Sequence, residues 1–225
     1  MVDKYYSITE ASKMFFRRFL MERCEGNRVL EYGCGPHSQA VLFSPRGATT
    51  ISIDLSPVAI SLHRDLVRRH GLARVHSCVM NAEYLGFAEN SFELICGTGI
   101  LHHLDLEGSL AELQTLRPGG SAIFLEPLGH NPIINAYSKL TPEMRSVDEH
   151  LLTVADFRVA EKYFQRIEIR YFHLLALAAF PFRRASWFRT FVRQLDQLDQ
   201  KVFCWFPFMR KHAWAAAIVL GGPKK

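Results

Sequence analysis

Residues 29–36 read Val-Leu-Glu-Tyr-Gly-Cys-Gly-Pro, and residues 51–54 read Ile-Ser-Ile-Asp. The first stretch is typical of a buried strand that runs into a tight glycine turn, and the second of a strand that ends in a carboxylate. Gly33 and Gly35 let the backbone approach a ligand closely, and the helix that follows offers free N–H groups at its N-terminus. An acid about 20 residues after such a turn grips a ribose in nucleotide-binding α/β folds. The sequence therefore predicts a cofactor that contains a nucleoside.

The spacing of the glycines argues against a dinucleotide. A G-x-G-x-x-G turn needs its third glycine where this chain has Ser38, and no further glycine occurs before Gly47. An acid and an aromatic residue, Glu31 and Tyr32, come directly before the turn instead. This arrangement resembles the first motif of class I S-adenosylmethionine-dependent methyltransferases.

The resemblance continues in order over roughly residues 25–130. Asp54 matches the ribose acid, and Asn81 and Ala82 match the pair that flanks the adenine. Three further stretches match the fourth strand, the turn after it and the turn before the fifth strand: residues 92–97, 101–104 and 116–120. The chain departs from the family at His37, where many members have a third glycine, at Asn81, where an aspartate is common, and at Glu93, which replaces a common aspartate. An amide oxygen can still accept from the adenine amino group, so the change at Asn81 is compatible with binding.

The resemblance implies S-adenosylmethionine as the cofactor and assigns a residue to each of its parts. The methionine part would lie over the end of the first strand and its turn, the ribose would bind the acid, and the adenine would be packed and bordered by the residues that follow the next two strands. The backbone after the fourth strand would face the methionine ammonium. The residues so assigned are Glu31, Tyr32, Gly33, Cys34, Gly35, Asp54, Leu55, Asn81, Ala82 and Gly97.

The composition limits the number of domains and the class of protein that the chain can form. A chain of 225 residues is long enough for one substantial core and too short for two comfortable domains. Five cysteines, an odd number without tight spacing, argue against a disulfide framework and indicate a reducing, cytoplasmic setting. No early stretch has the form of a signal peptide, and no run approaches the roughly 20 apolar residues that a membrane-spanning helix needs.

The charge and the fourth motif bear on the methyl acceptor. A formal net charge of +5 permits nucleic acid binding but does not demand it. Methyltransferases that act on base amines usually carry Asn/Asp-Pro-Pro-aromatic after the fourth strand, where this chain has Gly97-Thr98-Gly99-Ile100. That turn also lacks a Pro-Cys nucleophile of the cytosine-C5 type. We therefore expect a small-molecule acceptor and no nucleic acid partner.

Strand and helix patterns alternate along the chain. They predict a Rossmann-like, doubly wound α/β fold with a mostly parallel seven-stranded sheet, helices on both faces, and a single domain over residues 1–225. Strands are expected near 28–32, 50–54, 75–79, 92–96, 121–126, 164–172 and 213–220, and helices near 4–24, 37–44, 57–70, 107–116 and 153–163. An insertion rich in aromatic residues and arginine, at about 174–210, is expected to form a helical layer over the substrate pocket or against a membrane or partner.

Candidate catalytic residues follow the fourth and fifth strands. His102 and His103 are suited to act as a base near neutral pH; the alternative is that one of them caps or packs the next helix. Glu126 and His130 follow the fifth strand and are further candidates for a base or a substrate contact. A metal site formed by His130 with Asp148, Glu149 and His150 lacks a diagnostic spacing, so no metal is expected. Asp148 and Glu149 can instead cap a helix or pair with an arginine.

Three functions remain open at this point. The first is methyl transfer to oxygen or carbon of an apolar or aromatic small molecule, which the aromatic-rich insertion favours. The second is methyl transfer to a membrane-resident quinone or lipid, with peripheral membrane contact through the same insertion. The third is a non-catalytic subunit that binds the cofactor and acts through a partner. The sequence does not fix the oligomeric state.

Overall fold

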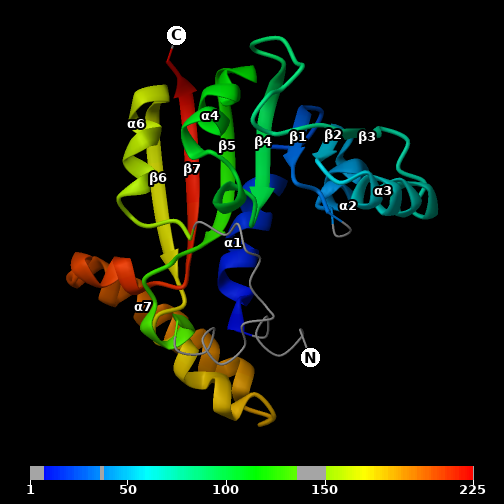
Figure 1. The fold of residues 1–225 in the computed structure, drawn as a ribbon. Coiled ribbons are helices and arrows are strands. Elements are labelled where there is room, and N and C mark those ends of the chain that lie inside the picture. Colours follow the sequence, from blue (N-terminus) through cyan, green and yellow to red (C-terminus); the bar gives the residue numbers. More distant parts are fainter. Residues whose placement is uncertain (1–7, 36–37, 136–150, 225) are drawn as a thin grey trace.

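The computed structural model describes residues 8–35, 38–135 and 151–224, which form one mixed sheet with helices on both of its faces (Figure 1). The strand order is β3-β2-β1-β4-β5-β7-β6. All neighbouring strands are parallel except β7, which runs antiparallel to β5 and β6. The predicted Rossmann-like, mostly parallel seven-stranded sheet is therefore confirmed. The strands are β1 (Arg28–Tyr32), β2 (Thr49–Asp54), β3 (Val75–Val79), β4 (Phe92–Thr98), β5 (Leu116–Pro127), β6 (Phe164–Phe172) and β7 (Ala215–Pro223).

The strand order reverses between β1 and β4, and this reversal positions the site. Tyr32 at the end of β1 pairs with Ile53 of β2 on one side and with Gly97 of β4 on the other. The connection after β1 leads towards β2, whereas β4 is followed by β5 on the opposite side. Chains leave in opposite directions at such a point, so a crevice opens beyond the carboxyl ends of these strands.

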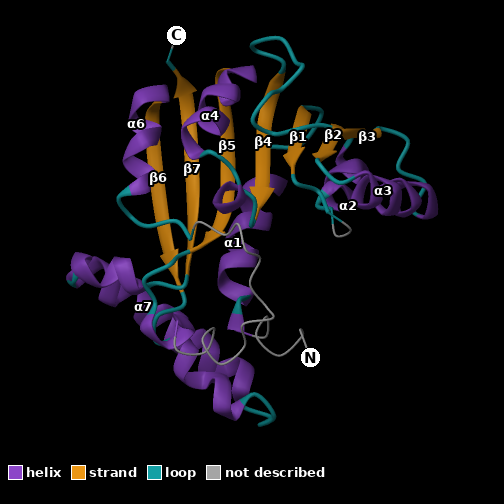
Figure 2. Cartoon of the chain, in the orientation of Figure 1, coloured by secondary structure: helices purple, strands orange, loops and turns teal. Residues whose placement is uncertain are grey.

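The helices divide between the two faces of the sheet (Figure 2). On one face, α1 (Glu10–Met21) and α2 (Ala40–Phe43) bury Phe16, Leu20 and Phe43 against side chains that point the same way from β1, β4 and β5. On the other face, α4 (Leu106–Glu112) and α6 (Ala160–Tyr163) contact each other and contribute Leu110 and Ala160 to the larger core cluster. The alternation of side chains along the strands thus fills both faces with apolar residues, as a sheet covered on both sides requires.

Several predicted helices are shorter in the structure. Helix α1 begins after Thr9 and ends at Met21, so the predicted span of 4–24 was too long at its end. Of the helix predicted at 37–44, α2 begins only at Ala40 and ends at Phe43, where Pro45 and the left-handed Gly47 continue the chain as a 3₁₀ turn. The predicted helix at 107–116 is divided between α4 and a 3₁₀ segment, Leu113–Thr115, and that at 153–163 between Asp156–Val159 and α6.

Helical segments lie between β6 and β7, beyond the edge of the sheet at which β4 and β5 end (Figure 1). They are a 3₁₀ segment (Ala176–Phe182), α7 (Phe188–Trp205) and a second 3₁₀ segment (Pro207–His212). The buried carboxylate of Asp199 on α7 accepts hydrogen bonds from the backbone N–H groups of Leu174 and Leu175 at 2.9 and 2.7 Å. This bonding fixes α7 to the chain that leaves β6. Within the described ranges, no helix is both long and apolar enough to cross a membrane.

Candidate active site

Glu31 lies at the end of β1 and ties three elements together. Its buried carboxylate accepts a hydrogen bond from the Ser52 hydroxyl of β2 at 2.8 Å. It also accepts from the Ser38 hydroxyl and from the backbone N–H of Gln39, which precede α2. Burial raises the pKa of Glu31, and these three hydrogen bonds oppose that shift. The side chain therefore ties Ser38 and Gln39 to the ends of β1 and β2.

The turn itself has the backbone that close approach of a ligand requires. Gly33 and Gly35 both have left-handed φ angles, +59° and +50°. A Cβ at Gly33 would lie 2.7 Å from Ile100 Cδ1, so a side chain there would also disturb the loop after β4. The backbone N–H of Cys34 donates to Ile53 at 3.0 Å, and burial raises the pKa of its thiol, which makes the thiol unreactive.

The aromatic ring of Tyr32 faces the core and not the turn. Its side chain is fully buried and packs edge-to-face against Phe124, with ring centroids 5.7 Å apart. Burial also raises the pKa of its hydroxyl. Only the backbone of Tyr32 can therefore contribute to a cofactor site, which refines the role that the sequence assigned to this residue.

Asp54 is placed where a ribose acid is needed. Its carboxylate accepts hydrogen bonds from the Gly35 backbone N–H at 3.0 Å and from the Ser56 backbone N–H at 2.9 Å. Ser56 in turn caps α3 (Pro57–Arg69) by accepting from Ala59 N–H. The side chain of Leu55 is 69% exposed beside it and offers an apolar surface for a ring. The glycine turn, the carboxylate and this surface together fit the nucleoside grip that the motif predicts.

Asn81 and Ala82 lie in the loop after β3. The Asn81 side-chain oxygen accepts from the Glu83 backbone N–H at 3.0 Å, and Ala82 is buried. The Asn81 oxygen, which is expected to accept from the adenine amino group, thus already uses one lone pair for the hydrogen bond from Glu83. Its second lone pair is the one that a ligand can use.

Gly97 allows β4, β5 and the following loop to pack at close range. A Cβ at this position would lie 2.7 Å from Ile100 Cγ2 and 2.9 Å from Phe124 Cδ1. Contacts this short force neighbouring side chains to move. The glycine therefore lets the backbone of β4 reach the crevice without filling it.

Substitution Gly97→Ala should lower the free energy of unfolding by about 1–3 kcal/mol, because the added methyl overpacks the contact with Ile100 and Phe124. Urea denaturation monitored by circular dichroism measures the change. Gly86→Ala is the matched control, because its Cβ would meet only Met80 Cε at 3.9 Å. Equal midpoints for the two variants would show that the crevice wall tolerates a side chain at Gly97.

Glu126 and His102 form a buried pair at the ends of β5 and β4. One carboxylate oxygen of Glu126 accepts from the backbone N–H groups of Ile100 and Leu101, each at 3.0 Å. The other lies 2.8 Å from His102 Nδ1. When the carboxylate is ionised it can only accept hydrogen bonds, so Nδ1 of His102 is then the donor of the pair. In the neutral imidazole, Nε2 then has the lone pair, as a general base requires.

The other candidate histidines lie elsewhere. His103 is exposed, although its ring stacks at 4.0 Å on that of His102. His130 is also exposed, and its backbone carbonyl lies 3.2 Å from His212 Nδ1. Neither lines the cavity described below. Asp148, Glu149 and His150, like His37, lie outside the described residues, and within the described part of the chain no three metal-binding side chains gather.

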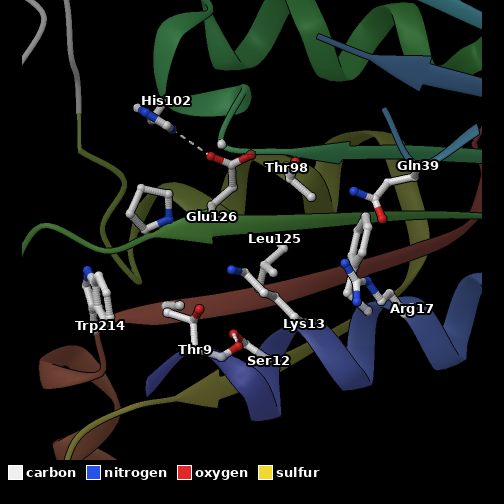
Figure 3. A pocket seen from close by; sticks show the side chains of 14 residues that line it. Thr9, Ser12, Lys13, Arg17, Gln39, Thr98, His102, Leu125, Glu126 and Trp214 are labelled. Atoms are coloured by element: carbon white, nitrogen blue, oxygen red, sulfur yellow. Dashed lines mark hydrogen bonds and ion pairs between the residues drawn. The ribbon is translucent and has the colours of Figure 1, made fainter. Parts of the chain in front are cut away.

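A cavity of about 520 Å³ adjoins the pair (Figure 3). Glu126, His102 and Thr98 line it from the sheet, Trp214 and Ala215 from the start of β7, and α1 forms the facing wall. The sequence did not single out the polar residues of that wall. These residues are Thr9, Ser12, Lys13 and Arg17, with Gln39 from the turn before α2. The signal that the sequence gives of them is their helical spacing along α1 and its N-cap.

A buried hydrogen-bond network fixes α1 in this position. His173 Nε2 lies 2.8 Å from the Ser12 hydroxyl, and His173 Nδ1 lies 3.1 Å from an oxygen of Asp196 on α7. His173 has a left-handed φ of +63°, which is uncommon for a residue other than glycine. The network thus joins α1, the end of β6 and α7 across the cavity wall.

Comparison with known proteins agrees with this geometry. The family model described as "Methyltransferase domain" matches residues 30–124. The 2-heptyl-1-hydroxyquinolin-4(1H)-one methyltransferase of Mycobacteroides abscessus is 26% identical over 142 residues, which are 60% of this chain and 63% of that protein. Aklanonic acid methyltransferase DauC of a Streptomyces species is 32% identical over 117 residues, 48% of this chain and 52% of that protein. The chain thus spans between about half and two thirds of these relatives.

The fold has solved counterparts as well. Phosphoethanolamine N-methyltransferase 2 of Haemonchus contortus, solved with phosphomonomethylethanolamine and S-adenosylhomocysteine, superposes with a TM-score of 0.68 at 16% identity. The match covers 99% of this chain and 57% of that one. Residues 30–124 are thus similar to a methyltransferase domain, and the described chain shares the fold of solved S-adenosylmethionine-dependent methyltransferases.

Proposed function

We propose that the protein transfers a methyl group from S-adenosylmethionine to oxygen or carbon of an apolar or aromatic small molecule. The observation that carries this proposal is the His102–Glu126 pair, which lines the cavity where β4 and β5 end. Apolar side chains of Phe16, Leu125 and Trp214 line much of that cavity and suit an apolar acceptor. Two relatives that are methyltransferases named for small molecules support the same class of acceptor.

Different residues of the chain have different roles in the proposed reaction. When bound, S-adenosylmethionine supplies an electrophilic methyl group, whose bond to sulfur breaks as its bond to the acceptor forms. Gly33, Gly35 and Asp54 hold the nucleoside and the methionine part in place. His102 Nε2 takes the proton that the acceptor oxygen or carbon loses. Glu126 keeps the other ring nitrogen protonated and stabilises the imidazolium that results.

Label transfer from methyl-labelled S-adenosylmethionine into a metabolite extract tests this function. We expect one or a few extract components to become labelled, and Asp54→Ala to abolish the labelling at low cofactor concentration. A protein that binds S-adenosylhomocysteine by calorimetry but labels nothing in any extract would be the non-catalytic binding subunit instead.

A second candidate acceptor resides in a membrane, and the exposed aromatic residues of α7 favour it. Trp187, Phe191, Leu198 and Trp205 recur every three to seven residues along one stripe of this helix. The side chains of Trp187, Leu198 and Trp205 are 49%, 42% and 66% exposed. Apolar stripes of this kind, with basic residues nearby, bind the surface of anionic bilayers.

If the acceptor is membrane-resident, Trp205→Ala should reduce co-sedimentation with vesicles that contain anionic lipid, and binding of the unmodified protein should weaken as salt is raised. Tyr84→Ala removes an aromatic side chain of similar exposure, 74%, far from α7 in sequence, and serves as the control. If the protein does not sediment with vesicles, and Trp205→Ala instead raises the KM of a soluble acceptor, the small-molecule function remains and the membrane alternative is excluded.

A further inference from the structure

Positive charges converge where the acceptor cavity continues between α1 and the start of α7. Lys13 and Arg17 line both the cavity and a second hollow of about 470 Å³. Arg183 and Arg189 line that hollow from its other side. Lys13 and Arg17 lie one turn apart on α1, Arg183 precedes α7 and Arg189 lies in its first turn, so four cationic side chains line the hollow and two of them also border the cavity.

Cationic side chains outnumber carboxylates among the described residues that line the hollow. Glu10 is the carboxylate that lines the hollow, and its Oε1 lies 3.5 Å from Arg193 Nη2. Among the described residues, no carboxylate forms an ion pair with Arg17, Arg183 or Arg189. A hollow in which one sign of charge is in excess concentrates ions of the opposite sign.

The state of Lys13 agrees with this excess of charge. Burial, and after it the positive charge of Arg17, lowers the pKa of Lys13. Both causes disfavour the charged ammonium. An anion in the hollow would counteract the effect of Arg17 on the pKa of Lys13, because it would stabilise the ammonium. It would also stabilise the neighbouring guanidinium groups.

The walls of the same space are largely apolar. Phe16 and Leu125 line the cavity, and Met14 and Phe188 line the hollow. The guanidinium of Arg183 lies over the Phe180 ring, 4.8 Å from its centroid, which orients it. A ligand that fits both properties has an apolar body and an anionic end.

We propose that the methyl acceptor carries a carboxylate, sulfate or phosphate group, and that Arg17, Arg183 and Arg189, together with Lys13, bind this group between α1 and α7. The inference rests on the proposed function for the identity of the ligand as an acceptor. The binding site itself does not depend on methyl transfer, so it can be tested without turnover. The methionine carboxylate of the cofactor is the competing source of the same chemistry.

Calorimetry at low salt with two probes of equal shape provides the test. The probes are 2-naphthoate and its neutral analogue 2-naphthamide. The unmodified protein should bind naphthoate about 3- to 10-fold more tightly than naphthamide, because partly exposed guanidinium groups form charge-assisted hydrogen bonds that solvent screens in part. Arg183→Gln and Arg17→Gln should each reduce this preference.

Sequence neighbours give matched controls. Arg184→Gln and Arg18→Gln remove the same charge from exposed side chains that do not line the hollow, so both should keep the preference for naphthoate. The proposal is overturned if naphthoate does not bind at millimolar concentration, if both probes bind equally, or if the control variants lose the preference as much as the test variants. It is also overturned if Arg183→Gln and Arg17→Gln weaken S-adenosylhomocysteine and leave naphthoate unchanged, because the site would then bind the cofactor. Label transfer without naphthoate selectivity would leave the proposed function standing.

Discussion

Replacing His102 with alanine should lower turnover by about 10²–10⁴-fold while leaving the affinity for S-adenosylhomocysteine nearly unchanged. The variant removes the proposed base but none of the groups proposed to bind the nucleoside, which lie at the ends of β1 and β2. Single-turnover label transfer at saturating cofactor measures the chemical step, and calorimetry measures the affinity.

His103→Ala is the matched control, because His103 is exposed and does not line the cavity. Near-normal turnover is expected from it, and also from His130→Ala. If His102→Ala keeps near-full turnover on the true acceptor, the reaction proceeds by positioning alone and His102 is a packing residue.

Glu126→Gln extends the same experiment to the partner of the base. The amide keeps one acceptor oxygen and places an NH2 group at the other position, so either the backbone N–H groups of the loop after β4 or the ring of His102 would lose its acceptor. Because the two residues act as one unit, the double variant should be no slower than the more impaired single variant.

Asp54→Ala should weaken the binding of S-adenosylmethionine by about 1.5–3 kcal/mol, or roughly 10- to 100-fold, because hydrogen bonds to a charged carboxylate are lost. Titration of S-adenosylhomocysteine in a calorimeter measures the effect. Thermal unfolding must be recorded beside it, since Asp54 also accepts from Gly35 and Ser56.

Asp65→Ala is the control for this substitution. It removes an exposed carboxylate of α3 that pairs with Arg68 at 3.2 Å, far from the glycine turn. Unchanged cofactor affinity in Asp54→Ala would remove the basis for the nucleoside grip.

The proximity of the expected cofactor-binding residues could be predicted from the sequence because they are close together in the chain. Gly35 and Asp54 are 19 residues apart and meet because two adjacent parallel strands end side by side. To predict that His102 meets Glu126, one must also know that β4 and β5 are neighbours in the sheet. The alternation of strands and helices along the chain already favours that adjacency. Both residues were therefore candidates before the contact was known.

The acceptor side could not be predicted in the same way. An apolar repeat shows which face of α1 is buried, but not which flank of the helix borders a cavity. That choice depends on the packing of α1 against β5 and β7 and on the contact of His173 with Ser12, which are 161 residues apart. The lengths of α2 and α4 were missed for a different reason, since proline and 3₁₀ turns end helices whose apolar pattern continues.

The separation of Ser12 from His173 also has a consequence for folding. The cofactor crevice is built from contacts within residues 28–98, whereas the acceptor cavity closes only when α1 meets the end of β6 and the helix α7. Contacts between residues so far apart carry a large loop-closure cost and form late. A growing chain could therefore acquire its affinity for the nucleoside well before it acquires any selectivity for what is methylated.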